Sequence, residues 1–211
     1  MKTKFWLMAF LCIGLCTQGI SAQNAKSILD KTAAKLNKGG MLASFELTTF
    51  KGTAQQGTVN GKINVQGNKL LIDAPEMGIW YDGKTQWTLM KANNEVNIST
   101  PEGEEAQPMN PYVFVNLYKK GYNLSLKDAT YQGNVCHEVR MLAQNAQAPI
   151  QEMLITISKT TYLPQSIRIR QGKNAWTRIR ISNLSIGKHW KDEHFRFNEQ
   201  EHPEAEVIDL R

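Results

Sequence analysis

Cysteine is scarce in this sequence, with three residues in a chain of 211. Two of them, Cys12 and Cys16, lie in an apolar run near the N-terminus, and the third is Cys136. If the N-terminal run is removed during export, one cysteine remains and an intramolecular disulfide is excluded. We therefore expect a fold that is stabilised by its hydrogen-bonded sheet and its core.

Blocks of lysine and arginine are also missing, and this argues against a nucleic-acid partner. The formal net charge is +6, and it falls to +4 without Lys2 and Lys4. Such a mildly basic balance is compatible with weak attraction to anionic lipid surfaces, although it does not require it.

The apolar run itself, residues 5–16, is too short to span a membrane. It follows Lys2 and Lys4, and the small residue Ala22 ends the segment. This order is typical of a signal peptide, so we expect cleavage of residues 1–22. A lipoprotein signal is the alternative, but both N-terminal cysteines follow a leucine, where such a site prefers a small residue.

Residues 23–211 form a chain of 189 residues, which suits one sandwich- or barrel-sized domain. No tandem repeat or linker suggests a second domain. Gln23 to Lys38 is predicted to be a helix that ends at Gly39, because apolar residues recur at three- and four-residue spacing. We expect its apolar face to pack on a sheet. If the protein binds a ligand, the same face is expected to close the cavity as well.

From residue 41 onward the apolar period changes to two, which predicts strands. Thirteen segments are candidates, from which about eleven strands are expected, and those between 44 and 99 are predicted to form an antiparallel meander with short turns. The candidates are 44–49, 61–65, 70–72, 79–81, 85–90, 95–99, 122–126, 135–142, 153–158, 165–170, 176–181, 195–197 and 207–210.

The stretch Ile79 to Met90 is predicted to be a tight hairpin around Asp82-Gly83. Asp-Gly suits a two-residue type I′ turn, in which both central residues have positive φ. On the return strand Trp87 and Leu89 share one face. Two tryptophans beside one turn give a large apolar surface, which is either core or the lining of a ligand site.

Residues 100–108 form an acidic loop without apolar content, and its role stays open. Asn110-Pro111 then favours the start of a helix that ends at Lys120. Most side chains of this short helix are large and apolar, including Phe114 and Leu117. Such a helix is either buried between layers or in contact with a hydrophobic ligand.

Arginine and isoleucine alternate in two later strands, Ser166 to Arg170 and Arg178 to Ile181. Such alternation is typical of a sheet with one solvated face. The arginines are then solvated residues or a patch for lipid headgroups or a partner.

Sequence motifs for catalysis are absent: there is no G-x-S-x-G, no P-loop and no G-x-G-x-x-G. Cys136 and His137 are adjacent in a strand, so their side chains point to opposite faces. His189 and His194 lie near two acidic residues, but neither a cysteine nor a regular spacing supports a metal site. We predict a non-enzyme without metal or cofactor.

The hairpin carries a family resemblance. YDGKTQW at 81–87, followed by NNEVNIS at 93–99, resembles a segment of the periplasmic outer-membrane lipoprotein carrier proteins, the LolA family. The order of signal, amphipathic helix and flanking strands is similar too. The resemblance implies a mainly β fold, a single curved antiparallel sheet forming an incomplete barrel, with helices on its concave side.

It further implies a periplasmic monomer that takes acylated lipoproteins from an inner-membrane lipoprotein-releasing ABC transporter to an outer-membrane acceptor. A periplasmic lipid-binding module or an envelope-stress sensor of the same fold is the alternative. The residues expected to line the acyl-chain cavity are Phe45, Leu47, Ile63, Val65, Leu70, Ile72, Trp80, Trp87, Leu89, Phe114, Leu117, Met141, Leu154, Ile167, Ile169, Ile179 and Ile181.

One feature departs from the family pattern. Family members carry an arginine shortly before the hairpin, where it bonds the lid helix, and residues 65–69 contain none. Gln66 or Lys69 could take this role.

Overall fold

The computed structural model describes residues 17–101 and 117–211. Residues 1–16, Phe114 and most of the predicted loop and helix at 100–120 therefore lie outside the described residues. The elements are α1 (Thr17–Leu36), β1 (Gly40–Lys51), β2 (Ala54–Gln66), β3 (Lys69–Asp73), β4 (Met77–Tyr81), β5 (Gln86–Met90), β6 (Glu95–Ser99), η2 (Leu117–Lys119), β7 (Tyr122–Tyr131), β8 (Asn134–Ala143), β9 (Glu152–Ser158), β10 (Pro164–Gln171), β11 (Ala175–Lys188), η3 (Asp192–Phe195), η4 (Glu199–Glu201) and β12 (Glu206–Asp209).

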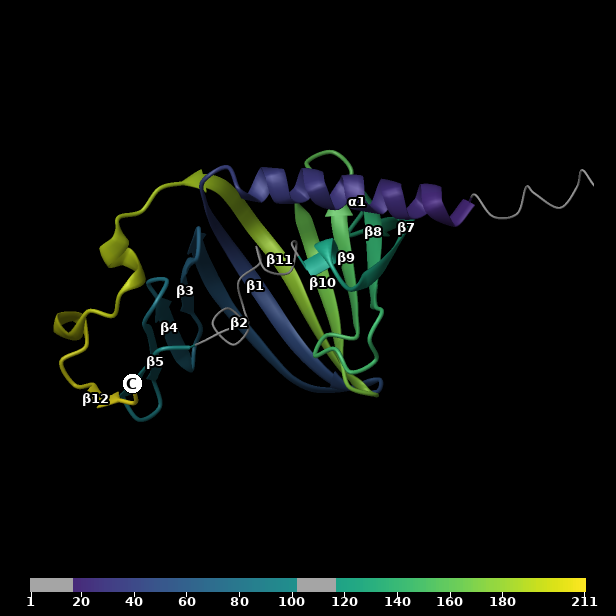
Figure 1. Cartoon of the computed structure of the whole chain (residues 1–211). Coiled ribbons are helices and arrows are strands. Elements are labelled where there is room, and N and C mark those ends of the chain that lie inside the picture. Colours follow the sequence, from purple (N-terminus) through teal and green to yellow (C-terminus); the bar gives the residue numbers. More distant parts are fainter. Residues whose placement is uncertain (1–16, 102–116) are drawn as a thin grey trace, which may run out of the picture.

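All twelve strands belong to one curved sheet that does not close into a barrel, as Figure 1 shows. Their order is β12-β6-β5-β4-β3-β2-β1-β11-β10-β9-β8-β7. This confirms the predicted mainly β, half-open architecture. Only the last pairing departs from the antiparallel prediction, because β12 pairs in parallel with β6. After β11 the chain crosses the sheet to its far edge, where β12 lies beside β6 and runs in the same direction.

Helix α1 crosses one face of this sheet, here called the inner face; the opposite face is the outer face (Figure 1). Two core clusters lie between α1 and the inner face. The first joins the middle of α1 to β8, β9 and β10, and the second joins its C-terminal end to β1, β2 and β3. Ile28 and Leu29 belong to the first cluster, whereas Leu36 belongs to the second.

The helix begins at Thr17, six residues before the predicted start, and ends at Leu36 rather than Lys38. Its core residues, from Ala25 to Leu36, all lie beyond the predicted cleavage site after Ala22. A chain that begins at residue 23 therefore keeps every side chain with which α1 enters the two clusters.

Two local predictions are wrong. The connection between β4 and β5 is not a two-residue type I′ turn, because only Gly83 has positive φ. Instead, the Asp82 carboxylate accepts the backbone N–H groups of Lys84 and Thr85, at 3.0 and 2.9 Å, and this side chain stabilises a longer loop. The segment 195–197 is not a strand, since Phe195 ends the 3-10 helix η3.

Residues 189–205, here called the C-terminal strap, run from β11 across the outer face to the far edge of the sheet (Figure 1). Trp190 and the Gln66 side chain exchange two hydrogen bonds, at 2.9 and 3.1 Å. The His194 ring bonds the amide of Asn64 at 2.8 Å. Phe195 is 0 % exposed, so the strap has a core of its own.

Candidate functional site: the inner face

The inner face carries a partly open apolar surface between its two core clusters. Ile179 and Ile181 of β11 pack against both clusters but stay only half-buried. On one side Phe45 of β1 pairs with Ile181, and on the other Ile167 of β10 pairs with Ile179. Core packing normally covers isoleucines in the middle of a sheet. This gap is therefore the candidate site for an apolar ligand on the inner face.

A small, almost wholly apolar pocket occupies the gap. Its volume is about 40 Å³, close to the space of a single water molecule. Ten residues from β1, β2, β10 and β11 line it: Met41, Ala43, Phe45, Leu47, Ile63, Pro164, Ile167, Ile179, Ile181 and Leu184.

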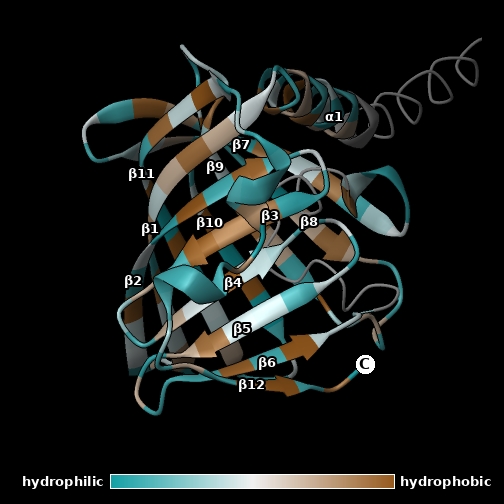
Figure 2. Cartoon of the chain, turned by 90° about the vertical axis from the view of Figure 1, so that its left-hand side faces the viewer, coloured by the Kyte–Doolittle hydropathy of each residue, from teal (hydrophilic) through white to brown (hydrophobic). Residues whose placement is uncertain are grey.

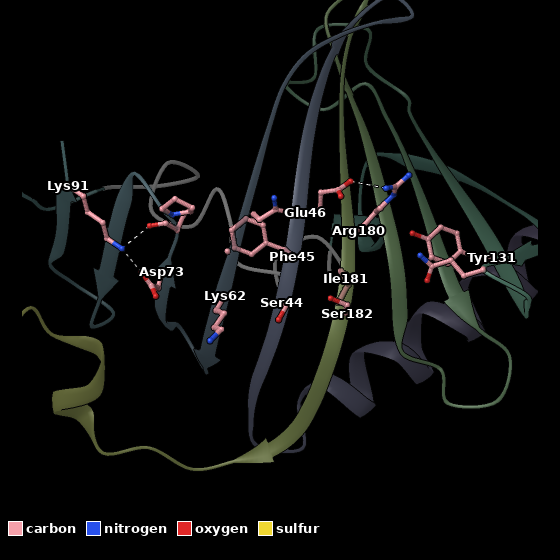
Figure 3. Close-up of a pocket in the computed structure, with 15 residues that line it drawn as sticks. Ser44, Phe45, Glu46, Lys62, Asp73, Lys91, Tyr131, Arg180, Ile181 and Ser182 are labelled. Carbon is pink, nitrogen blue, oxygen red and sulfur yellow. Dashed lines mark hydrogen bonds and ion pairs between the residues drawn. The ribbon is translucent and has the colours of Figure 1, made fainter.

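A second, wider and more open pocket of about 690 Å³ shares Phe45 and Ile181 with the first. This volume lies in the range of small-molecule sites. Figure 3 shows Lys91 and Asp73 at one end of the pocket, Phe45 and Glu46 in its middle and Tyr131 at the other end. Its lining is Ser44, Phe45, Glu46, Asn60, Gly61, Lys62, Asp73, Ala74, Pro75, Lys91, Tyr131, Gln132, Arg180, Ile181 and Ser182.

The acidic groups of the wider pocket are neutralised within the protein. Lys91 donates to the Asp73 carboxylate at 2.6 Å, and Arg180 donates to Glu46 at 2.9 Å (Figure 3). The Tyr131 hydroxyl is buried and has no hydrogen-bond partner within residues 17–101 and 117–211. In the alternation of β1 and β11, Glu46 and Arg180 point to the outer face, so the polar side of this pocket lies behind the apolar gap.

Most of the predicted cavity residues lie on the inner face. Six of them line the apolar pocket: Phe45, Leu47, Ile63, Ile167, Ile179 and Ile181. Five others belong to the two core clusters: Val65, Leu70, Ile72, Met141 and Ile169. Leu117 packs against the first cluster.

Four predicted cavity residues lie on the other face, contrary to the prediction. Ile72 of the inner face pairs with Ile79, so the next residue along β4, Trp80, points outward. Trp80 pairs with Trp87, which places Trp87 and Leu89 on the outer face as well.

Contacts made by the strap support this placement. The Trp80 ring lies edge-on to the rings of Phe197 and His202, with centroids at 5.3 and 5.8 Å. Leu154 is the fourth residue: it pairs with Arg140 and Arg168 between the inner-facing Met153 and Ile155. The predicted sharing of one face by Trp87 and Leu89 is confirmed, but that face is the outer one.

Each pocket also contains residues that were not predicted from the sequence. In the apolar pocket these are Met41 and Ala43, which alternate in β1 with Phe45, so the period of two could have identified them. In the wider pocket Tyr131 was not predicted, because the turn between β7 and β8 brings it there.

Gln66 and Lys69 bond the strap rather than α1 or η2. The partners of Gln66 are the backbone groups of Trp190, and Lys69 pairs with Asp192 at 2.5 Å. In the described part of the chain α1 is instead tied to η2, because the Tyr118 hydroxyl donates to the Asp30 carboxylate. Of the interactions that lower the pKa of Asp30, this hydrogen bond has the largest effect.

The reactive side chains do not converge. Cys136 pairs with Ser158 and His137 with Ile157, so their side chains point to opposite faces as predicted. Burial raises the pKa of the Cys136 thiol. Within the two described ranges, no group of three or more His, Cys, Asp and Glu side chains is arranged to hold a metal ion. None of the helices described is long and apolar enough to span a bilayer.

A half-open sheet with an apolar, partly open inner face defines a binding or carrier protein for apolar ligands. Sequence comparison agrees: the family model of the outer membrane lipoprotein carrier protein LolA matches residues 15–173. The chain belongs to this family. Members of the superfamily are periplasmic or envelope proteins, and their fold serves binding or carriage.

Solved structures resemble this chain to different degrees. An uncharacterized conserved protein from Thermus thermophilus aligns with 89 % of this chain and 99 % of its own, at 11 % identity and a TM-score of 0.59. A putative outer membrane lipoprotein-sorting protein domain from Vibrio parahaemolyticus covers 82 % and 97 % (11 % identity, TM-score 0.46). LprF from Mycobacterium bovis covers 81 % and 96 % (12 % identity, TM-score 0.49). No curated protein matches the sequence.

Proposed function

We propose that the protein is a periplasmic lipoprotein carrier, which holds acyl chains in the inner-face gap and passes them toward the outer membrane. The observation that carries this proposal is the half-buried apolar surface around Ile179 and Ile181, between two otherwise closed clusters. Family membership supports the same ligand class. In this scheme residues 1–22 direct export, and the mature protein acts as a monomer.

The donor in this proposal is an inner-membrane lipoprotein-releasing ABC transporter, and the recipient is an outer-membrane acceptor. Burying ten methylenes stabilises a complex by roughly 8 kcal/mol. That corresponds to a dissociation constant of about 1 μM before ordering costs are subtracted. Affinity of this order suits a carrier, because much tighter capture would prevent release.

The ligand must widen the gap in order to bind. The apolar pocket of about 40 Å³ is too small for an acyl chain. Four of the ten lining side chains, including Leu47 and Leu184, are only half-buried, so these four can move apart while the buried ones keep their packing. In this proposal the gap therefore widens when the apolar ligand binds.

The first test identifies the natural ligand. The protein is purified from its native periplasm, and the bound material is analysed by mass spectrometry. Acylated lipoprotein is the expected result. Free phospholipid would instead favour a lipid-binding module or an envelope-stress sensor that does not hand lipoprotein on. Absence of bound lipid, together with no binding of an acyl-chain probe in vitro, would overturn both functions.

A second test locates the site with one substitution on each face. Ile181→Asp places a carboxylate in the apolar gap, where hydrocarbon cannot solvate it, and should weaken binding of a fluorescent fatty acid more than tenfold. Leu154→Asp is the matched control: Leu154 is also half-buried, but it lies outside, between Arg140 and Arg168. We expect less than a twofold effect there.

Both variants are checked for folding by urea denaturation. If Ile181→Asp does not fold, Ile181→Trp replaces it, because the larger ring fills the gap while keeping it apolar. Equal affinities of the Ile181 variant and the Leu154 variant would place the acyl-chain site elsewhere.

A further inference from the structure

The outer face behind the gap carries arginines in adjacent positions. In the register of the sheet Arg168 of β10 lies directly opposite Arg178 of β11. One row further along, Arg170 lies opposite Trp176, which in turn pairs with Phe50 of β1. These five residues are here called the arginine face.

Charge on the arginine face is only partly compensated. Glu46 serves both Arg180 and Arg178, at 2.9 and 3.6 Å, and Glu152 serves both Arg170 and Arg140, at 3.1 and 2.6 Å. Arg168 is exposed and has no carboxylate within ion-pair distance in the described part of the chain. Because like charges directly opposite each other destabilise a sheet, this arrangement points to an anionic ligand.

Aromatic rings hold the guanidinium groups in place. The Arg168 and Arg170 guanidinium carbons lie 5.1 and 5.9 Å from the centroid of the Trp176 ring, and that of Arg178 lies 5.2 Å from the Phe50 ring. A guanidinium that lies over a ring uses its flat face, so its N–H groups stay available at the edge. The Nε atom of Arg178 is buried and without a hydrogen-bond partner among the described residues.

The arginine face adjoins two exposed hairpin ends. Residues 51–60, at the turn between β1 and β2, and residues 171–175, between β10 and β11, are all exposed. Each turn adds a lysine, Lys51 or Lys173. Basic groups beside half-buried tryptophan and phenylalanine are the combination that the membrane–water interface favours.

We propose that the arginine face and the two hairpin ends form a docking surface for anionic phospholipid headgroups. The N–H forks of Arg168 and Arg178 bind lipid phosphates, which removes the repulsion between the two side chains. Trp176 rests at headgroup level, and Lys51 and Lys173 add long-range attraction to the charged surface. The surface lies on the opposite side of the sheet from the acyl-chain gap, so membrane contact leaves the gap unobstructed.

The test measures binding of the full protein to vesicles of phosphatidylcholine with and without phosphatidylglycerol. We expect binding only to the anionic vesicles. Each basic residue near the surface contributes about a fivefold factor in affinity. Arg168→Gln together with Arg178→Gln should therefore weaken binding about 25-fold, while fatty-acid binding stays unchanged.

Lys84→Gln together with Lys191→Gln is the matched control, since both lysines are exposed and lie away from the arginine face. A less than threefold loss is expected for this pair. Equal losses in the two double variants, or equal binding to neutral vesicles, would overturn the proposal.

Trp176 gives an independent readout. Anionic vesicles should shift the tryptophan emission of the wild type to shorter wavelength, and Trp176→Phe should remove most of that shift while keeping an aromatic platform. A shift that persists in Trp176→Phe would contradict docking at this face. Binding to polyglutamate but not to anionic vesicles would overturn the proposal in favour of an acidic protein partner.

Discussion

The two ends of the sheet bury opposite faces. At the β8–β11 end the inner face is apolar and covered by α1, whereas the outer face is charged and open. At the β5–β6 end the relation is reversed. Leu89, Val96 and Ile98 are buried on the outer face, next to Trp87, and Thr88 and Asn97 point inward. In Figure 2, β5 and β6 accordingly contain both hydrophilic and hydrophobic segments.

The difference teaches that apolar alternation alone does not tell which face meets the ligand. Each half of the sheet alternates with a period of two, and each half has a covered apolar face. One cover is α1, which leaves a gap beside it, and the other is the C-terminal strap, which closes over Phe195. The aromatic hairpin therefore belongs to a structural core, and the plainer isoleucine strands form the candidate site.

Removing the centre of the strap should have the largest effect on stability. Phe195 is 0 % exposed, and Phe195→Ala should lower the free energy of unfolding by about 3–5 kcal/mol. Urea denaturation measures this change, with Val135→Ala, at a residue 59 % exposed, as the control. Fatty-acid affinity of the folded fraction should stay unchanged. A decrease in the free energy of unfolding below about 1 kcal/mol would show that Phe195 does not form a stabilising core under the strap.

Truncating the tryptophan of the hairpin should have a moderate effect. Trp87 is half-buried on the outer face, so Trp87→Ala should cost about 2 kcal/mol of stability, less than a fully buried tryptophan. Affinity for the fatty-acid probe should change less than twofold. A stable variant that no longer binds the probe would reverse our assignment of the two faces.

Acid should loosen the strap. Burial lowers the pKa of His194 in the folded protein, whereas in the unfolded chain the ring titrates near its ordinary value of about 6.5. Above that pH both states are neutral and the contribution of the neutral ring is fully present. Below it the unfolded chain binds a proton that the folded protein resists, so stability falls with falling pH.

The contribution of this residue is isolated by His194→Gln, which can still bond Asn64. The variant should lose less stability than the wild type between about pH 7.5 and about pH 5.5. The comparison is needed because the carboxylates whose pKa is lowered, such as Asp30, also weaken the fold in acid. Identical pH profiles of variant and wild type would rule out His194 as the cause.

The smallest effect concerns the free hydroxyl of the open pocket. Tyr131→Phe removes a buried group that has no partner among the described residues, so the stability of the free protein should change by less than about 0.5 kcal/mol or rise. Tyr131 does not line the apolar gap, so affinity for a lipopeptide held there should change less than twofold. Affinity for a simple alkane should not change. A marked loss of stability without ligand would show that the hydroxyl has a structural partner.

Local patterns in the sequence predicted most of the elements. β6 occupies its predicted range, 95–99, and α1 keeps its predicted apolar positions. The first half of β2, residues 54–60, was not predicted, because it is exposed on both faces and its pairing with β1 leaves no apolar period. Most of the inner-face residues followed from alternation, since Phe45, Ile63 and Ile167 lie in strands whose covered face is the inner one.

The remaining errors share a long-range cause. Nothing near Trp80 in the sequence shows that Phe197 and His202 will cover it from outside. The strap that brings them there is held by Gln66 and Asn64, far from it in the chain. Likewise, the polar pocket forms only where the β7–β8 turn approaches β1. Such contacts depend on topology, which a local period does not contain.

The central pairing of β1 with β11 has a consequence for the folding kinetics. Glu46 and Arg180, which meet across this pair, are 134 residues apart in the chain. The hairpins β1–β6 and β7–β10 are local and close early, whereas this pairing must wait until loop-closure entropy is overcome. The apolar gap contains side chains from both halves, Phe45 and Ile181. A polypeptide emerging N-terminus first therefore lacks the proposed acyl-chain site until β11 has emerged.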